Sequence, residues 1–383
     1  MDYLTIGLLL FAVYPQTIRY STHNDTLIKQ ANKNYVKAKD DADLLLKTLR
    51  IYEATSPGRV YAGRGGAWGK GFRVVETPYY MYLSTYGIPT VLWLPQTWSP
   101  NSDTEQYFSE DQEKDYVLYN IRYVVAPAPR SPASPDEVGP PPQPFWNVIK
   151  ESPSWKLYEV TGLPVIPAQA GIQPSKVDSR FRGNDNDAMG YITTGIRPAI
   201  VSTDKENFIN VVRLWIQSEY HKQGLYPELT FDKSYPKSTG LPNFRMLDEV
   251  TFQVPDGSTH NLFAEVPSYL NPVGDLGNLM NITSQNDDSD MVFKATVELK
   301  ENCAECLVIL KQTSHPSWRA TIDGKPAETL TVFPFYTAVK LETPGTHEVV
   351  FSYRSSWTKI GLLILSTVAV VWLTGKYLFG GRF

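Results

Sequence analysis

An apolar run near the C-terminus, IGLLILSTVAVVWLTGKYLF from Ile360 to Phe379, most constrains what this chain can fold into. A helix needs about 20 mostly apolar residues to cross a bilayer, and this run has that length. Lys359 precedes it, and Lys376 and Arg382 near its far end can reach the headgroup region. A buried core helix is the alternative, but a chain end of the composition KYLFGGRF does not favour it. We therefore predict a transmembrane helix over residues 358–379.

A second apolar segment, YLTIGLLLFAVY, begins at Tyr3. It is too short to cross a bilayer alone, and Asp2 together with the Tyr14-Pro15-Gln16 sequence argues against a signal peptide. We predict that residues 1–18 are the tail of a transmembrane segment whose first part is missing. The chain would then sit in the cell membrane, held to the lipid bilayer at two points, with an extracytoplasmic soluble part between them. The basic residues that flank the two segments are balanced and do not fix the orientation.

The composition of the chain limits its partners. It is 42% hydrophobic and 20% charged, which is typical of a folded protein. The net charge of −4 gives no basic footprint, so we expect no nucleic-acid partner. The five histidines are scattered and the two cysteines form a single pair, so we predict no metal site and no cofactor.

The order of apolar runs and breaks predicts an α+β fold: a mixed α/β soluble ectodomain, then an antiparallel β-sandwich, then the C-terminal transmembrane helix. We expect the ectodomain over residues 19–126, 146–163 and 191–290, and the sandwich over residues 291–357. A proline-rich segment over residues 127–145 indicates an extended linker or an exposed loop.

Local patterns predict several elements of the ectodomain. DDADLLLKTLRIY, from Asp40 to Tyr52, predicts a helix with acidic residues at its favourable end. Strands are predicted over Arg122–Val125, Trp155–Val160 and Arg197–Ser202. Thr203, with Glu206 three residues later, has the pattern of a capping box and predicts the start of an amphipathic helix.

The sequence from Met291 onward indicates β-structure. Five candidate strands follow one another: MVFKATVELK, CLVILKQ, SWRATIDGKPAE, YTAVKLE and HEVVFSYR. The Asp323-Gly324 and Pro344-Gly345 pairs supply turns between them. Short strands at this spacing are typical of an antiparallel sandwich.

The segment over residues 164–190 has no apolar period, and we interpret it as an insertion derived from a DNA repeat. One legal coding of IPAQAGI, residues 166–172, has a reverse complement that translates as DSRLRGN. The chain has DSRFRGN at residues 178–184, so the two halves can be the arms of a palindrome. If the insert lies on the surface, it destabilises the fold only a little, because the entropic cost of closing a loop rises slowly with loop length. We expect the segments on its two sides to belong to one domain.

The glycine-rich segment GRGGAWGKGF, from Gly63 to Phe72, resembles a phosphate-binding loop but does not match it. The P-loop pattern requires a glycine where Arg64 stands and a hydroxyl residue after Lys70, where Gly71 stands. Two interpretations remain: a plain structural loop, or a loop in which Arg64, Trp68 and Lys70 contact a glycan or a lipid phosphate.

Cys303 and Cys306 form a C-x-x-C pair between two predicted strands. Zinc would require two further ligands, and redox catalysis would require a helix start in a βαβ setting. A local structural disulfide in an oxidising compartment is the favoured interpretation, and free thiols are the alternative.

Asp103 and Glu105 in WSPNSDTEQYF are a pair of carboxylates that could contact a glycan. Paired carboxylates can also perform acid–base chemistry on a glycosidic bond. Acidic loops are common, so we assign no catalytic residue from this pattern.

Two stretches of the chain resemble known membrane proteins. The segment that begins GRVYAGRGGAWGKGF and ends YVLYNIRYVVAP resembles membrane proteins described as 6-pyruvoyl-tetrahydropterin synthase-related. The C-terminal part resembles YfhO-like membrane proteins, in which a W-x-A-x-(V/I)-D-G hairpin, a G-x-H-x-V-x-F-x-Y strand and an anchor helix end the chain. The matching positions are Trp318, Ala320, Ile322, Asp323, Gly324, Gly345, His347, Val349, Phe351 and Tyr353.

The resemblance implies a polytopic glycosyltransferase of the GT-C type, whose catalytic acid lies early in the chain and whose donor is a lipid-linked sugar. This chain would then be the extracytoplasmic C-terminal domain and membrane anchor, not catalytic by itself, with a missing N-terminal membrane half as its partner. An independent module that binds carbohydrate or assists envelope assembly is the alternative. An enzyme that uses Asp103 and Glu105 is a third class.

Overall fold

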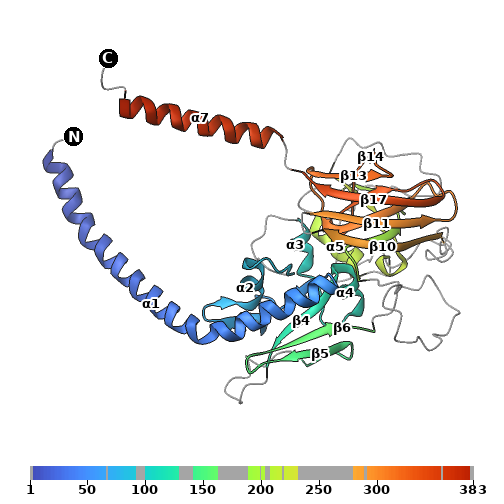
Figure 1. The fold of residues 1–383 in the computed structure, drawn as a ribbon, viewed down its shortest axis with the longest axis horizontal. Helices are drawn as coiled ribbons and strands as arrows, with labels where there is room; N and C mark the ends of the chain where they lie inside the picture. Colours follow the sequence, from blue (N-terminus) through green and yellow to red (C-terminus); the bar gives the residue numbers. More distant parts are fainter. Residues whose placement is uncertain are drawn as a thin grey trace, which may run out of the picture. The chain divides into compact units, whose positions relative to one another are not determined.

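The computed structural model describes residues 3–65, 68–91, 100–128, 141–162, 189–198, 200–202, 208–217, 220–231, 279–288, 291–354 and 357–379. Contacts divide the chain into two compact units (Figure 1). Unit 1 comprises Met1–Thr97 and Glu110–Leu163, and unit 2 comprises Trp98–Ser109 and Pro164–Phe383. The predicted α+β class is confirmed, because helices and several largely antiparallel sheets occur together.

Unit 1 is built on a four-stranded sheet with the order β1-β4-β6-β5. β4 and β6 contain the two strands predicted for this region, and both are largely buried because they form the middle of the sheet. β1 pairs with β4 in parallel, whereas β6 pairs antiparallel with β4 and β5. The strands are β1 (Arg59–Tyr61), β4 (Ile121–Pro127), β5 (Trp146–Glu151) and β6 (Trp155–Val160).

The proline-rich segment joins β4 to β5 within this one sheet. Most of the segment lies outside the described residues, but its two ends belong to the same unit. The segment therefore connects two strands of one sheet, and whether it is an extended linker or an exposed loop stays a prediction.

A long helix, α1 (Tyr3–Thr55), packs on the sheet of unit 1 with its C-terminal part. Ala42, Leu45, Leu46 and Leu49 follow helical spacing and are buried in the core. The predicted helix over residues 40–52 is thus confirmed as part of a longer one. Residues 3–18 of the predicted membrane segment fall in α1, and the side chains before residue 14 lie outside the described residues.

Shorter elements complete unit 1 around a group of aromatic side chains. The rings of Phe72 and Tyr79 stack 4.0 Å apart between centroids, and Tyr79 contacts Tyr82 edge-on. The elements are η1 (Trp68–Lys70), β2 (Arg73–Val74), β3 (Thr77–Pro78), α2 (Tyr79–Thr85) and α4 (Glu113–Tyr119).

Unit 2 contains two sheets. The first has five strands in the order β10-β11-β17-β13-β14, all antiparallel, and faces the viewer in Figure 1. Buried and less buried residues alternate along β11, as expected for a sheet with one face on a core. The strands are β10 (Met280–Asp288), β11 (Val292–Leu299), β13 (Trp318–Ile322), β14 (Lys325–Ala327) and β17 (Gly345–Tyr353).

The second sheet has six strands in the order β7-β12-β16-β15-β9-β8. Residues 306–311 of β12 are all buried, so both faces of this sheet are covered. The two sheets extend beyond the region predicted for the sandwich, residues 291–357, because β7, β8, β9 and β10 come from before residue 291. The strands are β7 (Ile192–Ile196), β8 (Ile200–Ser202), β9 (Glu228–Thr230), β12 (Cys306–Thr313), β15 (Leu330–Val332) and β16 (Tyr336–Lys340).

The helix α5 (Phe208–Gln217) packs against the six-stranded sheet through an apolar face. Trp215 is fully buried, stacks on Phe333 and donates its indole N–H to the carbonyl of Leu225 at 3.1 Å. The predicted amphipathic helix is confirmed, but its predicted capping residues, 203 and 206, lie outside the described residues. The short helices α3 (Pro100–Glu105), which contacts α5, and η3 (His221–Gln223) complete the unit.

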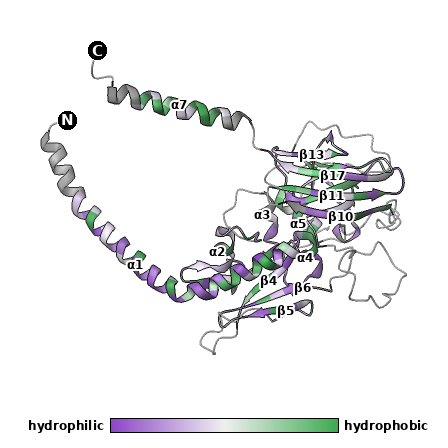
Figure 2. Ribbon diagram, viewed as in Figure 1, coloured by the Kyte–Doolittle hydropathy of each residue, from purple (hydrophilic) through white to green (hydrophobic). Residues whose placement is uncertain are grey.

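The last helix is α7 (Trp357–Phe379), whose central residues are mostly hydrophobic (Figure 2) and are exposed. Leu363 is 67% exposed and Trp372 is 63% exposed. Among the described residues, no helix meets the length and hydropathy required for a membrane span.

The predicted insertion over residues 164–190 lies outside the described residues except for Met189 and Gly190, which are buried. The expectation that its two flanks share one domain was wrong. β6 belongs to the sheet of unit 1, whereas β7 and β8 belong to the six-stranded sheet of unit 2. The segment after the insertion belongs to unit 2 because β7 pairs with β12, a strand that lies far away in the sequence.

Candidate functional site

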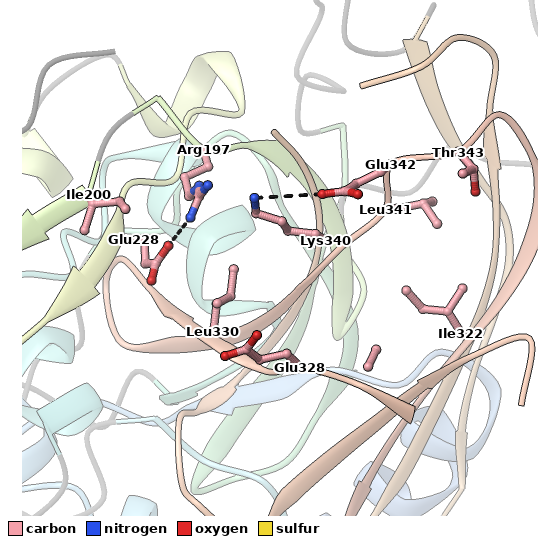
Figure 3. Close-up of a pocket in the computed structure, with 11 residues that line it drawn as sticks. Arg197, Ile200, Glu228, Ile322, Glu328, Leu330, Lys340, Leu341, Glu342 and Thr343 are labelled. Atoms are coloured by element: carbon pink, nitrogen blue, oxygen red, sulfur yellow. Dashed lines mark hydrogen bonds and ion pairs between the residues drawn. The ribbon is translucent and has the colours of Figure 1, made fainter. Parts of the chain in front are cut away.

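A pocket of about 700 Å³ opens in unit 2 where strands of both sheets begin or end (Figure 3). Its volume lies within the range of small-ligand sites. Charged side chains form much of its wall, with aliphatic side chains between them. The pocket is lined by Arg197, Ile200, Glu228, Ile322, Ala327, Glu328, Leu330, Lys340, Leu341, Glu342 and Thr343.

Strand register brings the charged residues of the pocket together. Cys306 of β12 is opposite Ile196 of β7, which places Arg197 beside Glu305. The backbone N–H of Arg197 donates to the carbonyl of Glu305 at 2.9 Å. On the other side of β12, Leu307 is opposite Lys340, so this lysine reaches the same carboxylate.

Arg197 is the buried centre of this group and is only 6% exposed. Its Nε donates to Glu305 Oε2 at 2.6 Å, and a second guanidinium nitrogen pairs with Glu228. Burial opposes the charged form of Arg197, but the two carboxylates outweigh it and the pKa of the guanidinium is raised. Charge-assisted hydrogen bonds of this kind fix the orientation of all three side chains.

Lys340 extends the charged group toward the opening of the pocket. Its Nζ lies 3.9 Å from Glu305 Oε2 and 3.9 Å from Glu342 Oε1, and it is partly exposed. Among the described residues that line the pocket, the two cations Arg197 and Lys340 are outnumbered by the carboxylates of Glu228, Glu328 and Glu342.

The pocket could not be predicted from the sequence, because the charged residues that line it come from four separate segments. None of the candidate contacts predicted from sequence lines it. One feature noted in the sequence lies next to this charged group. Cys303 and Cys306 are joined by a disulfide, as predicted, and Glu305 lies between them. This short covalent loop carries the carboxylate that binds Arg197.

The carboxylates Asp103 and Glu105 lie on α3, and neither lines the pocket. Residues two apart on a helix do not face each other, so these two do not form a convergent pair. Burial raises the pKa of the half-buried Asp103. Glu105 is buried.

The glycine-rich loop belongs to unit 1, and its tryptophan is held by protein groups. The Nε1 of Trp68 donates to Glu110 Oε1 at 2.8 Å, and the hydroxyl of Tyr61 donates to the same oxygen. A Cβ on Gly63 would meet the Cα of Gly69 at 2.5 Å, so the loop closes on itself through two glycines. This arrangement fits the structural interpretation, with Arg64 and Lys70 exposed at the surface.

The residues of the YfhO-like pattern come together in the five-stranded sheet. β13 and β17 pair so that Trp318 is opposite Tyr353, Ala320 opposite Phe351, and Ile322 opposite Val349. Asp323 and Gly324 both have positive φ and form the turn into β14. The pattern therefore describes how two distant strands and one hairpin pack together.

Asp323 ties this hairpin to the start of β17. Its Oδ2 contacts the Nδ1 of His347 at 2.7 Å, and its Oδ1 accepts the backbone N–H of Glu348 at 2.9 Å. Two hydrogen bonds lower the pKa of Asp323: the bond with His347 has the larger effect, and the bond from the Glu348 N–H has the smaller one. The chain turns here at Gly345, whose φ of 139° favours glycine.

We expect the variant Asp323→Asn to lower the melting temperature by a few degrees at neutral pH. Asparagine tolerates the positive φ, so the change removes mainly the charge. Because the pKa of Asp323 is lower in the folded state, its stabilisation is complete above its unfolded value of about 4 and is lost as the pH falls through the folded value. Thermal unfolding followed by circular dichroism should show the two melting curves converging in acid.

The matched control is Glu301→Gln, which neutralises an exposed carboxylate in the connection between β11 and β12. A difference between Asp323→Asn and the parent protein that persisted unchanged at acidic pH would contradict the role of the charge.

The fold and the pocket together define a class of protein: an α+β chain with a charged pocket where strands of two sheets begin or end, followed by an apolar helix. No family model, curated protein or solved structure matches the chain. The likeness to YfhO-like proteins therefore stays a prediction from the residues themselves.

Proposed function

We propose that this chain is a non-catalytic binding module, anchored in the cell membrane by α7, that works outside the cytoplasm with a glycosyltransferase-like membrane half. Its pocket in the sandwich binds part of a cell-envelope glycan or of a lipid-linked sugar. The observation that carries the proposal is the exposed apolar surface of α7 directly after the sandwich.

The anchor is supported by the exposed side chains of α7. From Gly361 to Thr374 every residue is exposed, and most of them are large and apolar. Soluble proteins seldom leave so much contiguous apolar surface in water. The apolar run in the sequence extends further, to Phe379, and basic residues flank it.

The extracytoplasmic side is supported by the disulfide between Cys303 and Cys306. Disulfides form and persist in oxidising compartments and are rare in the cytosol. The bridge holds the loop of Glu305, so an oxidising environment would also favour an ordered pocket.

The binding role is supported by the construction of the pocket. Carboxylates and an ammonium group supply acceptors and donors suited to sugar hydroxyls. Ile322, Leu330 and Leu341 supply apolar wall against which the C–H groups of a sugar ring can pack. The alternative, an independent module, would use the same pocket and anchor without the membrane half.

The anchor is tested with the variant Leu363→Asp/Val370→Asp. We expect the full chain, reconstituted from detergent, to float with phosphatidylcholine vesicles in a density gradient. Each aspartate in the apolar stretch costs about 2.5–3.5 kcal/mol of insertion free energy, so the variant should lose at least about 100-fold in vesicle affinity.

The matched control is Ile51→Asp/Val148→Asp, which adds the same charge at two exposed apolar positions of unit 1. This control should float like the parent protein. A parent chain that stays at the bottom of the gradient, or an α7 variant that floats equally well, would overturn the anchor.

A further inference from the structure

The pocket is poorly suited to an anionic ligand because its cations are already engaged. Two carboxylates hold the guanidinium of Arg197, which is almost entirely buried. Lys340 lies between the carboxylates of Glu305 and Glu342. A phosphate or a uronate entering here would have to displace buried ion pairs and approach several negative groups, which costs free energy.

The carboxylates at the opening are more accessible than the cations. Glu328 and Glu342 are exposed, and both line the pocket. Among the described residues, Glu328 has no ion-pair partner, and Glu342 faces only Lys340 at 3.9 Å. Figure 3 shows the two carboxylates on different sides of the pocket, each carried by its own strand connection.

We infer that this pocket binds a ligand that carries primary ammonium groups, with Glu328 and Glu342 as counter-ions on different sides of the pocket and Lys340 as a donor to a neighbouring hydroxyl. The inference rests on the proposed binding function and names the ligand chemistry. An amino-sugar unit carries such an ammonium beside hydroxyls, and its ring can lie against Leu330 and Leu341. An aliphatic polyamine carries the ammonium without the hydroxyls or the ring.

Isothermal titration calorimetry on the full chain in detergent tests the inference with three probes: the glucosamine trisaccharide, its fully N-acetylated counterpart, and spermidine. We expect the glucosamine trisaccharide to bind and the N-acetylated one to bind at least about ten-fold more weakly, since acetylation removes the charge. Added salt should weaken binding because the partly exposed carboxylates are screened.

The variants Glu328→Gln and Glu342→Gln should each weaken glucosamine binding by about ten-fold, as expected for the loss of one charged hydrogen bond. Both side chains are exposed, so these variants should fold. The control Glu301→Gln removes the same charge outside the pocket and should bind like the parent protein.

The outcomes separate the ligand chemistry from the proposed function. Equal binding of the two trisaccharides would overturn the ammonium inference but leave glycan binding intact. Spermidine binding together with weak glucosamine binding would support the ammonium and assign it to a polyamine. Binding of neither glucosamine nor spermidine would overturn the inference, whereas the vesicle experiment tests the anchor independently of any ligand.

Discussion

The variant Arg197→Leu should lower the free energy of unfolding of unit 2 by about 3–5 kcal/mol. Arg197 is buried, and its guanidinium binds Glu228 and Glu305, whose side chains are only 14% and 12% exposed. Removing the cation leaves two carboxylates close together with little water to solvate them. For a domain of this size, such a loss corresponds to a fall in melting temperature of about 6–20 °C.

Urea unfolding followed by tryptophan fluorescence measures this effect. The control Arg354→Leu makes the same substitution at an exposed arginine of unit 2 and should change the stability little. The triple variant Arg197→Leu/Glu228→Gln/Glu305→Gln also neutralises the two carboxylates that would otherwise lack a cation. It should therefore recover much of the lost free energy of unfolding. A single variant as stable as the parent would contradict the buried ion-pair centre.

The variant Trp215→Ala should lower the free energy of unfolding of unit 2 by about 3–5 kcal/mol. The substitution removes the indole ring with which α5 packs against the six-stranded sheet, and it leaves a cavity there. The indole is fully buried, stacks on Phe333 and packs against Tyr226. Its removal also leaves the carbonyl of Leu225 without the indole N–H. Unit 2 should then unfold at lower urea concentration than in the parent protein.

Two further variants separate the contributions of Trp215. Trp215→Phe keeps an aromatic ring but loses the hydrogen bond, so it should lie between the parent and the alanine variant. Trp372→Ala, at a mostly exposed tryptophan of α7, should change the urea midpoint little. Equal midpoints for Trp215→Ala and Trp372→Ala would show that α5 does not hold the sheet.

Most strands after Met291 could be predicted because each alternates apolar and polar residues or forms a continuous apolar run. β15 was not predicted, and the single candidate SWRATIDGKPAE folds as the two strands β13 and β14. HEVVFSY predicts β17 with Val349 and Phe351 on one face, and both are buried. The Asp323-Gly324 turn was predictable for a local reason, since few residues tolerate positive φ at two successive positions. The disulfide was predictable because the two cysteines are three residues apart in a strand connection.

The sheet order and the pocket could not be predicted, because both depend on contacts between distant segments. β8 and β9 are only three residues long, and their places follow from tertiary pairing, since β9 pairs with β15 and β8 pairs with β9. Arg197, Glu228 and Lys340 look like ordinary surface charges in the sequence. Only the register of β7, β12 and β16 brings Arg197 and Lys340 to the same carboxylate, that of Glu305.

The position of β17 has a mechanical consequence. β17 is the central strand of the five-stranded sheet, paired with β11 on one side and β13 on the other, and α7 begins a few residues after it ends at Tyr353. Tension applied through α7 along the direction of β17 would load two ladders of hydrogen bonds in shear. All bonds of a ladder must then yield together, so the sandwich should resist a pull from its C-terminal end better than a pull that peels an edge strand such as β14.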